Sequence, residues 1–440
     1  MNHIIYIPIE IKNRELQGHL LLAHHLLVYG FKIIIGNKPK IYELILNKPN
    51  KSGVFLYKGG GRNPDLLKSI SNKVEHIYIL DQEIGYAVRN YEIFISRRYF
   101  KSTYEFIHKF FFLNHKISKM AHQYASIPLE KCITSGWPRV DLYKKQDIWS
   151  GDVNSIKNKY GNFILFASDF ATNTSHEVSE RTKRISKWSS ADSKTIISKQ
   201  SKIYQQSYEE YKLFIKSINN ISNQDNFPLL IIRPHHGEDF NQWLRDLLPS
   251  PKIIVINEGP IAPWIIASHG VLHRGCTSSV EAYFYNKPTA HLSKCAVSSK
   301  DTDTIKVSLP LNSDEELLEW MNKPRRKNID SDCFDIGQEN SAQFIANTIA
   351  ENATVKDLLY TKLKFNIVSF LSPIIPKFLK IFLKNILFIY KNPGLKPLAN
   401  YEQKMNGGIL KSEIIQFFKE YLIYKPFVKK LSKDLFLIEK

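Results

Sequence analysis

Cysteine is scarce in this sequence, and the four cysteines present form no C-x-x-C pair. Zinc-ribbon and thioredoxin-like sites are therefore not expected, and reduced thiols in a cytoplasmic protein are the simplest interpretation. The chain also lacks any run of about 18 apolar residues, so no membrane-spanning helix is predicted. The first residues, MNHIIYIPIEIKNRE, have neither a basic start nor a small-residue cleavage site, which argues against a signal peptide.

Acidic residues are in deficit, because 42 Asp and Glu stand against 61 Lys and Arg, a formal net charge of +19. Such an excess favours a polyanionic partner: nucleic acid, an anionic membrane surface or phosphorylated substrates. No nucleic-acid-binding motif is recognisable, so nucleic acid is not predicted as a partner. No Asp-x-Asp pair ends a predicted strand, and the adjacent His24 and His25 point apart on a predicted helix. We therefore predict neither a metal nor a cofactor.

Both halves of the chain alternate apolar strand-like runs with helical patterns, which is typical of parallel α/β sheets. The composition turns polar over residues 147–159, where we place a domain boundary. We predict a Rossmann-like domain over residues 1–150, a second over 151–355, and a basic, apolar, helical tail over 356–440. Two doubly wound domains facing a cleft are the expected architecture.

Three shorter segments receive specific assignments. We predict a strand over residues 92–96 and a helix over residues 103–112. Residues 171–199 are rich in Ser and Thr, which predicts an ordered surface insertion or a mobile loop.

The strongest local signal is the sequence IIRPHHGED at residues 231–239. Pro234 ends the predicted strand, so the following side chains project from the carboxyl edge of the sheet, where open α/β sheets bind ligands. Arginine and histidine can donate hydrogen bonds to phosphate, and His235 can offset charge on a leaving nucleotide. The alternative is a helix-entry loop with a satisfied histidine. We predict His235 as catalytic and, as substrate-binding residues, Arg233, His236 and Glu238.

A second signal is HRGCTSSVEA at residues 273–282, where an apolar strand leads into glycine, hydroxyl residues and a helix. Backbone N–H groups at a helix start, together with hydroxyl side chains, bind anions, and a carboxylate in the first turn can accept from ribose hydroxyls. The alternative is a capping box with Ser278 as N-cap and Glu281 three residues later. The binding interpretation assigns substrate contacts to Arg274, Thr277, Ser278, Ser279 and Glu281.

Charged residues also follow the predicted strands of the N-terminal half. An acceptor substrate needs a base or an orienting carboxylate, and these positions can supply one. Solvated loop charges are the alternative. We predict Glu10 and Glu15 as catalytic and Arg14, Lys58, Asp81 and Glu83 as substrate-binding.

Asp169 follows the first predicted strand of the second half. A carboxylate there can act as a nucleophile or orient the reacting sugar, so we predict Asp169 as catalytic. The alternative is that it caps the next element.

The tail segment 361–393 mixes lysines with aliphatic and aromatic residues, contains no acidic residue, and is broken by Pro373 and Pro376. This composition suits helices that lie in an anionic membrane interface, so we predict attachment to the inner membrane surface. The alternative is a helical subdomain that packs on the second domain with its lysines solvated.

Six motifs in order resemble the bacterial surface carbohydrate biosynthesis protein family over about residues 1–288: IPIEIKNRELQGHLLLAHHLLVYGFKIIIG, VFLYKGG, LDQEIG, TSGWPRVDLY, IIRPHHGEDFNQW and VLHRGCTSSVEAYFYNKP. This family is similar to GT-B β-Kdo transferases and, more distantly, to CDP-glycerol glycerophosphotransferases. The chain departs from the family at His236, where a second proline is usual, and at Asp169, where an amide-like residue is expected.

The resemblance implies a GT-B fold and a nucleotide-activated sugar as donor, with a CMP-ulosonic acid such as CMP-Kdo as one candidate. His235 would contact the nucleotide phosphate, Thr277 to Ser279 would cradle it, and Glu281 would bind the ribose. The residues Glu10, Arg14 and Glu15 would line the acceptor side or the reacting sugar.

We therefore predict a metal-independent glycosyltransferase that extends a surface polysaccharide or lipopolysaccharide glycan from a lipid-linked or oligosaccharide acceptor. It is expected in the cytoplasm, peripheral on the inner membrane. Two alternatives stay open: a polyol-phosphate transferase that uses a CDP-alcohol, and a non-catalytic component of a polysaccharide assembly complex.

Overall fold

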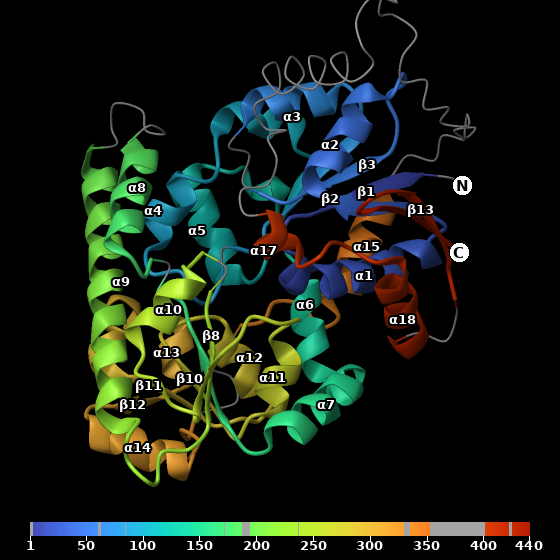
Figure 1. Cartoon of the computed structure of the whole chain (residues 1–440). Coiled ribbons are helices and arrows are strands. Elements are labelled where there is room, and N and C mark those ends of the chain that lie inside the picture. Colours follow the sequence, from blue (N-terminus) through green and yellow to red (C-terminus); the bar gives the residue numbers. More distant parts are fainter. Residues whose placement is uncertain are drawn as a thin grey trace, which may run out of the picture. The chain divides into compact units, whose positions relative to one another are not determined.

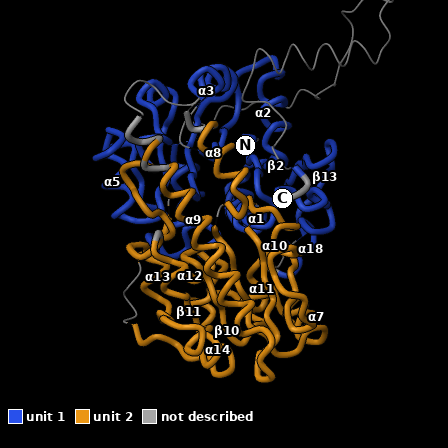
Figure 2. The backbone as a smooth tube through the Cα atoms, turned by 60° about the vertical axis from the view of Figure 1, so that its left-hand side comes forward, with its two compact units in different colours: residues 1–83, 95–141, 336–440 blue, residues 84–94, 142–335 orange. Residues whose placement is uncertain are grey.

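The chain folds into two compact units, shown in blue and orange in Figure 2. Unit 1 comprises residues 1–83, 95–141 and 336–440, and unit 2 comprises residues 84–94 and 142–335. Each unit thus combines segments that are separate in the sequence, whereas the predicted domains are contiguous. The structure, a computed structural model, describes residues 3–59, 63–83, 85–170, 172–186, 194–235, 237–329, 335–352, 401–421 and 425–440.

Unit 1 is built on an eight-stranded sheet in the order β13-β14-β2-β1-β3-β4-β5-β6. Figure 1 labels its strands β1, β2, β3 and β13. The strands are β1 (Ile4–Ile9), β2 (Lys32–Asn37), β3 (Val54–Tyr57), β4 (His76–Leu80), β5 (Lys109–Phe112), β6 (Cys132–Thr134), β13 (Phe427–Ser432) and β14 (Leu435–Glu439). The strands from β1 to β6 pair in parallel. Because β1 lies between β2 and β3, the strand order reverses between β1 and β3, which is the topological switch point where such sheets bind ligands.

The helices of unit 1 include α1, which buries Leu16, Leu20 and Leu27 at helical spacing. They are α1 (Lys12–Val28), α2 (Lys38–Asn47), α3 (Pro64–Ser71), α5 (His115–Ala125), α6 (Pro138–Asp141), α15 (Ser341–Asn352), α17 (Tyr401–Met405) and α18 (Lys411–Tyr421), with short 3₁₀ turns at Lys101–Phe106 and Leu129–Lys131. Helix α4 (Tyr91–Ser96) crosses the boundary between the units.

The C-terminal hairpin β13–β14 extends the unit 1 sheet. Strand β14 pairs antiparallel with β2, with Ile438 opposite Ile33, and residues Leu435 to Ile438 are buried. These two strands were not expected in the tail, which was predicted to be helical. The described part of the tail is therefore helix and hairpin, and the predicted membrane segment 361–393 lies outside the described residues.

Unit 2 holds a six-stranded parallel sheet in the order β12-β11-β10-β7-β8-β9. The strands are β7 (Ile164–Ala167), β8 (Leu230–Arg233), β9 (Ile253–Val255), β10 (Gly270–His273), β11 (Thr289–Leu292) and β12 (Leu309–Leu311). Counted within the unit, this is the order of a dinucleotide-binding Rossmann sheet, with its switch point between β7 and β10.

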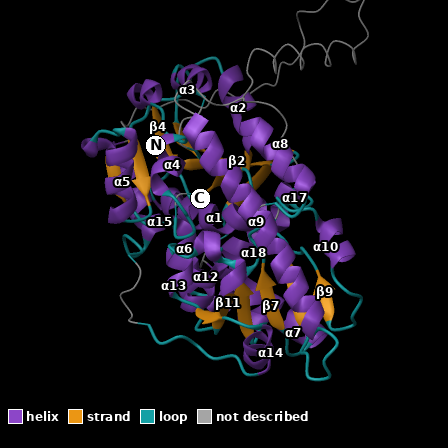
Figure 3. Cartoon of the chain, turned by 90° about the vertical axis from the view of Figure 1, so that its left-hand side faces the viewer, coloured by secondary structure: helices purple, strands orange, loops and turns teal. Residues whose placement is uncertain are grey.

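Helices surround the strands of unit 2, as the colours of Figure 3 show. They are α7 (Ser150–Tyr160), α8 (Ser175–Ser186), α9 (Lys194–Ile221), α10 (Phe240–Asp246), α11 (Ala262–Ala267), α12 (Ser278–Phe284), α13 (Asp303–Lys306) and α14 (Asp314–Asn322), with 3₁₀ turns at Leu142–Lys144, Gln146–Trp149, Ser293–Cys295 and Val297–Ser299. The main apolar cluster joins Phe166 of β7 to Phe214 of α9 and Trp243 of α10. The rings of Phe166 and Phe214 stack with their centroids 3.9 Å apart.

The predicted fold class, two Rossmann-type α/β units of the kind that make up GT-B proteins, is confirmed by the two strand orders. Two local predictions were wrong. Residues 91–96 are helical rather than extended, and the predicted helix over 103–112 ends in strand β5, whose KFFF sequence is aromatic and favours a strand. The polar stretch 171–199, predicted as an ordered surface insertion or a mobile loop, holds α8 and the start of α9 among its described residues, so this part is ordered. Tyr211, Phe214 and Ile218 further along α9 anchor that long helix to the core.

Candidate functional site

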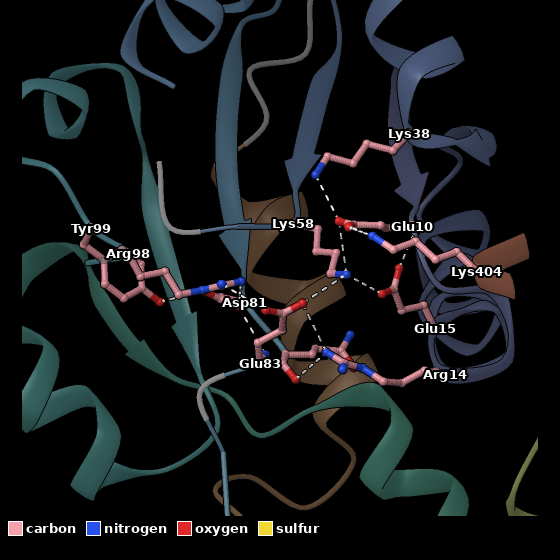
Figure 4. Close-up of polar contacts among 11 residues, drawn as sticks. Glu10, Arg14, Glu15, Lys38, Lys58, Asp81, Glu83, Arg98, Tyr99 and Lys404 are labelled. Carbon is pink, nitrogen blue, oxygen red and sulfur yellow. Dashed lines mark hydrogen bonds and ion pairs between the residues drawn. The ribbon is translucent and has the colours of Figure 1, made fainter. Parts of the chain in front are cut away.

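The charged residues predicted after the strands of the N-terminal half gather in unit 1, as the close-up in Figure 4 shows. Glu10 and Glu15 follow β1, Lys58 follows β3, and Asp81 and Glu83 follow β4. The carboxyl ends of adjacent parallel strands meet at one edge of a sheet, so these side chains surround the β1/β3 switch point.

Lys58 is the centre of this charge cluster. Its Nζ lies 2.6 Å from Glu15 Oε1 and 3.4 Å from both Glu10 Oε2 and Glu83 Oε1. Burial by itself would lower the pKa of Lys58, but the carboxylates of Glu15, Glu83 and Glu10 outweigh it and raise that pKa above its usual value. Lys58 is therefore a permanently charged ammonium held by three carboxylates.

Glu10 accepts from two further lysines. Its Oε2 lies 3.0 Å from Lys38 Nζ, and its Oε1 lies 2.9 Å from Lys404 Nζ of α17. Burial raises the pKa of Glu10, but the charges of Lys58, Lys38 and Lys404 together hold it far below its usual range. A carboxylate in this setting stays ionised and is a weak proton acceptor, so Glu10 is suited to accept hydrogen bonds rather than to act as a general base.

Arg98 and Arg14 complete the cluster on its other side. Arg98 forms a two-pronged contact with Asp81, with Nη2 2.7 Å from Oδ1, and its Nη1 lies 2.9 Å from Glu83 Oε2. Arg14 Nη2 lies 3.5 Å from Glu83 Oε1 and donates to the backbone oxygen of Gln82 at 3.3 Å. Burial opposes it, but Arg98, Lys58 and Arg14 lower the pKa of Glu83 well below its usual value. The cluster thus balances fixed cations against fixed anions.

Sequence reasoning missed Lys38, Arg98 and Lys404 as members of the cluster. Lys38 begins α2 directly after β2, so a search of every strand end could have found it. Arg98 follows residues 92–96, which were predicted as a strand but are helical. Lys404 lies in the tail, 394 residues from its partner Glu10. No local pattern could have connected Lys404 to the first strand.

In unit 2, the two motifs of the second half lie on either side of β7. Ala167 at the end of β7 pairs with Arg233 of β8 on one side and with His273 of β10 on the other. The corner after β8 and the turn after β10 therefore reach the same carboxyl edge of one sheet, and the turn adjoins the β7/β10 switch point.

The two arginines of these motifs donate hydrogen bonds to other groups of the protein. Arg233 donates from Nη1 to Glu258 O and from Nη2 to Gly259 O, the latter at 2.8 Å. Arg274 donates from Nε to Glu210 Oε2 at 2.7 Å and from Nη1 to Asp169 O at 2.6 Å. Arg233 and Arg274 are 6% and 1% exposed. Both guanidinium groups therefore stabilise neighbouring loops.

Glu238 is likewise a buried anchor. Its carboxylate accepts from Ser168 Oγ at 2.7 Å, from the backbone N–H of Phe170 at 2.8 Å and from Trp243 Nε1 at 3.0 Å. Burial raises the pKa of Glu238 to about 7, although the hydrogen bonds from Ser168 and Trp243 work against the rise. This side chain joins the end of β7 to the corner after β8.

His235 is half-buried at that corner. Its Nδ1 accepts a hydrogen bond from the backbone N–H of Gly237 at 3.2 Å. That contact places the proton of the neutral ring on Nε2, so Nε2 is a hydrogen-bond donor. The neighbouring His236, predicted to bind substrate, lies outside the described residues.

The turn after β10 is shaped by Gly275, which has a φ of 106°. Helix α12 starts at Ser278 with Thr277 as its N-cap and no side-chain cap bond, so the proposed capping box headed by Ser278 does not form. Ser279 is fully buried, with its Oγ 3.0 Å from the carbonyl oxygens of Cys276 and Thr304. Thr277 and Glu281 are half-buried and Ser278 is buried.

Asp169 follows β7 at the switch point, with 24% of its side chain exposed. Its Oδ2 lies 3.9 Å from Nη2 of Arg89, a residue that no sequence motif identified. Arg89 belongs to the 84–94 segment, which is far from β7 in sequence and is part of unit 2 only through tertiary structure.

The described part of the chain holds neither a metal-binding cluster nor a membrane-spanning helix. Among the ranges that the structure covers, no group of three or more His, Cys, Asp and Glu side chains could hold a metal ion. In the same ranges, no helix combines the length and the apolar character needed to cross a bilayer.

Comparison with known proteins gave structural similarity only. No protein-family model matches the chain, and no curated protein matches it. The UDP-GlcNAc 2-epimerase of Methanocaldococcus jannaschii, in complex with UDP-GlcNAc and UDP, is 12% identical, with a TM-score of 0.48, over 80% of this chain and 100% of its own. The Neisseria meningitidis UDP-GlcNAc 2-epimerase bound to UDP-GlcNAc is 13% identical, with a TM-score of 0.45 over the same shares. The wall teichoic acid polymerase TagF, as its H444N variant, is 8% identical, with a TM-score of 0.41 over 80% of this chain and 88% of its own.

Proposed function

We propose that this protein is a metal-independent, GT-B-type glycosyltransferase that moves a sugar from a nucleotide-activated donor to a growing surface polysaccharide or lipopolysaccharide glycan. The observation that carries the proposal is the carboxyl edge of the unit 2 sheet. There the ends of β8, β7 and β10 bring His235, Asp169 and the Thr277–Ser278 turn to the edge that holds the switch point. Nucleotides bind at this position in Rossmann-type sheets.

The donor nucleotide has suitable partners at this edge. The Nε2–H group of His235 can donate to a phosphate oxygen and stabilise the negative charge that develops on the leaving nucleotide. Thr277 and Ser278 add hydroxyl donors, and Glu281 can accept from ribose hydroxyls. Asp169 is the carboxylate closest to the switch point by chain position and would orient the reacting sugar.

The unit 1 cluster would bind the acceptor. Glu10, Glu83 and Arg14 are each partly exposed, and ionised carboxylates and guanidinium groups form strong hydrogen bonds with sugar hydroxyls. Since three lysines keep Glu10 ionised, its proposed role is to position a hydroxyl group rather than to remove its proton.

The tail segment 361–393 would attach the protein to the cytoplasmic face of the inner membrane, on the strength of its lysine and aliphatic composition. Sedimentation with anionic phosphatidylglycerol vesicles tests this. A chain that lacks residues 361–393 should lose binding, and a full chain that stays in the supernatant contradicts the attachment.

A panel of CMP, CDP and UDP, scored by thermal shift, tests the donor site. A bound nucleotide raises the melting temperature by mass action, and the base that acts best names the donor class. His235→Ala should abolish most of the shift. The matched control is His269→Ala, because His269 is exposed and precedes β10 at the opposite edge of the same sheet. An unchanged shift in His235→Ala, or no shift with any nucleotide in the wild type, contradicts the proposed donor site.

A further inference from the structure

The β7/β10 switch point of unit 2 contains an arginine whose donors are only partly used. Arg89 Nε donates to Ser299 Oγ at 3.1 Å. Its Nη2 lies 3.5 Å from Asp169 O and 3.9 Å from Asp169 Oδ2, both at the outer limit of a polar contact. Within the described residues, Nη1 contacts no polar partner.

This pattern separates Arg89 from the arginines of the two sequence motifs. Arg274 and Arg233 each direct their terminal nitrogens to carboxylate or carbonyl oxygens at close range, and both are more than nine-tenths buried. The Arg89 side chain keeps 18% of its surface exposed. A guanidinium carries five N–H donors in a fixed fork, and the Nη1 donors of Arg89 have no polar partner among the described residues.

Ser299 fixes the position of the Arg89 guanidinium. The space beside Gly275 is filled by Ser299, since a Cβ on Gly275 would lie 2.5 Å from Ser299 Oγ. Ser299 thus contacts both the turn after β10 and the Nε of Arg89, while Asp169 after β7 contacts its Nη2. The guanidinium is tied to both strand ends that define the switch point.

The electrostatics at this position favour an anion. Burial and the nearby positive charge of Arg274 lower the pKa of Arg89 to about 10, and Asp169, Glu210 and Tyr204 offset them only in part. The charge of Arg274 is matched by Glu210 at 2.7 Å, whereas the nearest carboxylate oxygen to Arg89 is 3.9 Å away. A phosphate beside Arg89 would complete its hydrogen bonds and neutralise its charge.

We propose that Arg89 binds the phosphate of the donor, a nucleoside monophosphate or diphosphate, at the β7/β10 switch point of unit 2. This inference rests on the proposed function and assigns the phosphate contact to a residue outside both motifs. His235 would contact the same nucleotide from the corner after β8.

The test compares nucleotides with their nucleosides. The nucleotide that binds best among CMP, CDP and UDP, its nucleoside, and inorganic phosphate are titrated by calorimetry into the full-length wild type and variants. Arg89→Gln keeps a donor for Ser299 but removes the charge, and should weaken nucleotide binding by about 10- to 100-fold, as the loss of a charged hydrogen bond does. Nucleoside affinity should stay unchanged. Arg89→Lys keeps the charge without the fork and should recover part of the loss.

Arg325→Ala is the matched control, because Arg325 is 62% exposed and follows Pro324, which contacts Gly270 at the opposite end of β10. It removes one positive charge from the same unit and should leave nucleotide affinity unchanged. Equal weakening of nucleoside and nucleotide by Arg89→Gln, or no weakening of either, overturns the inference while leaving the proposed function in place. Binding of inorganic phosphate alone, lost in Arg89→Gln, would show an anion site that serves no nucleotide and would overturn both.

Discussion

Lys58 Nζ and Glu15 Oε1 lie 2.6 Å apart in unit 1, with only 4% and 1% of their side chains exposed. A buried ion pair is costly to break from one side, because the partner is left as an unpaired charge in a poorly solvated place. The pair joins the end of β3 to helix α1, so it also fixes the geometry of the surrounding cluster.

Replacing Lys58 by methionine should therefore destabilise unit 1 by about 3–5 kcal/mol. Urea denaturation would measure the change, with Lys68→Met as the control, since Lys68 is exposed on α3. The double variant Lys58→Met/Glu15→Leu should recover part of the loss. A single variant as stable as the control would show that the cluster contributes little to folding.

Gly275→Ala should be more damaging than an ordinary glycine substitution. The residue combines a φ of 106° with a space already filled by Ser299. Gly161→Ala is the control for backbone strain alone, because Gly161 has a φ of 62° and nothing lies within 4 Å of its Cβ position. We expect about 1–2 kcal/mol of destabilisation for Gly161→Ala and clearly more for Gly275→Ala, measured by urea denaturation. Equal losses would mean that Ser299 moves aside without cost.

Lys404→Met tests the link between the C-terminal segment and the first strand. Loss of one of the three lysines around Glu10 should raise the pKa of Glu10 towards its usual value. Both side chains are about one-fifth exposed, so solvent screens the pair and the expected loss of stability is only about 0.5–1 kcal/mol. A double-mutant cycle with Glu10→Gln measures the coupling, and Lys411→Met, an exposed lysine of α18, is the control. Additive effects in the cycle would contradict the coupling.

Glu238 of unit 2 and the carboxylates of the unit 1 cluster should respond to pH in opposite directions. Glu238 has a folded-state pKa of about 7, above the usual 4.5, so its contribution to stability is full below pH 4.5 and is lost as pH rises through 7. The difference between the folded-state pKa and the usual pKa of Glu238 corresponds to a change of roughly 3 kcal/mol in the free energy of unfolding. The pKa values of Glu10, Glu15 and Glu83 lie below 4.5, so their contribution is present above pH 4.5 and is lost as pH falls further.

Calorimetric melts of the wild type and Glu238→Gln between pH 5 and 8 would isolate the contribution of Glu238. His273 and His291 of unit 2 have pKa values that are lowered mainly by burial, so their contribution to stability rises with pH in both proteins. The melting temperature of the wild type relative to that of Glu238→Gln should therefore fall as pH rises. A difference between the two proteins that does not change with pH would assign the titration to another group.

Much of the fold followed from local pattern. Apolar periodicity reflects which face of an element is buried. For that reason the sequence predicts the buried strands IIYIPI and ILFA and the helix α1. The ends of the strands could be predicted for the same reason. The positions of Glu10, Lys58 and Asp169, which follow strand ends, could therefore be predicted as well. The elements that the sequence did not predict correctly are α4, β5 and the hairpin β13–β14, whose short sequences are stabilised by the elements against which they pack.

The sequence by itself determined two α/β units and the strand ends at which chemistry would occur, because hydrophobic periodicity and strand-terminating residues are local properties. Only the tertiary structure decided which side chains at those ends contact one another. In the folded chain, Arg233 and Arg274 donate hydrogen bonds to neighbouring loops. Arg89 lies beside Asp169, and Lys404 forms an ion pair with Glu10. Hydrogen bonds and ion pairs depend on distances between residues far apart in the chain, and those distances are fixed only when the sheets assemble.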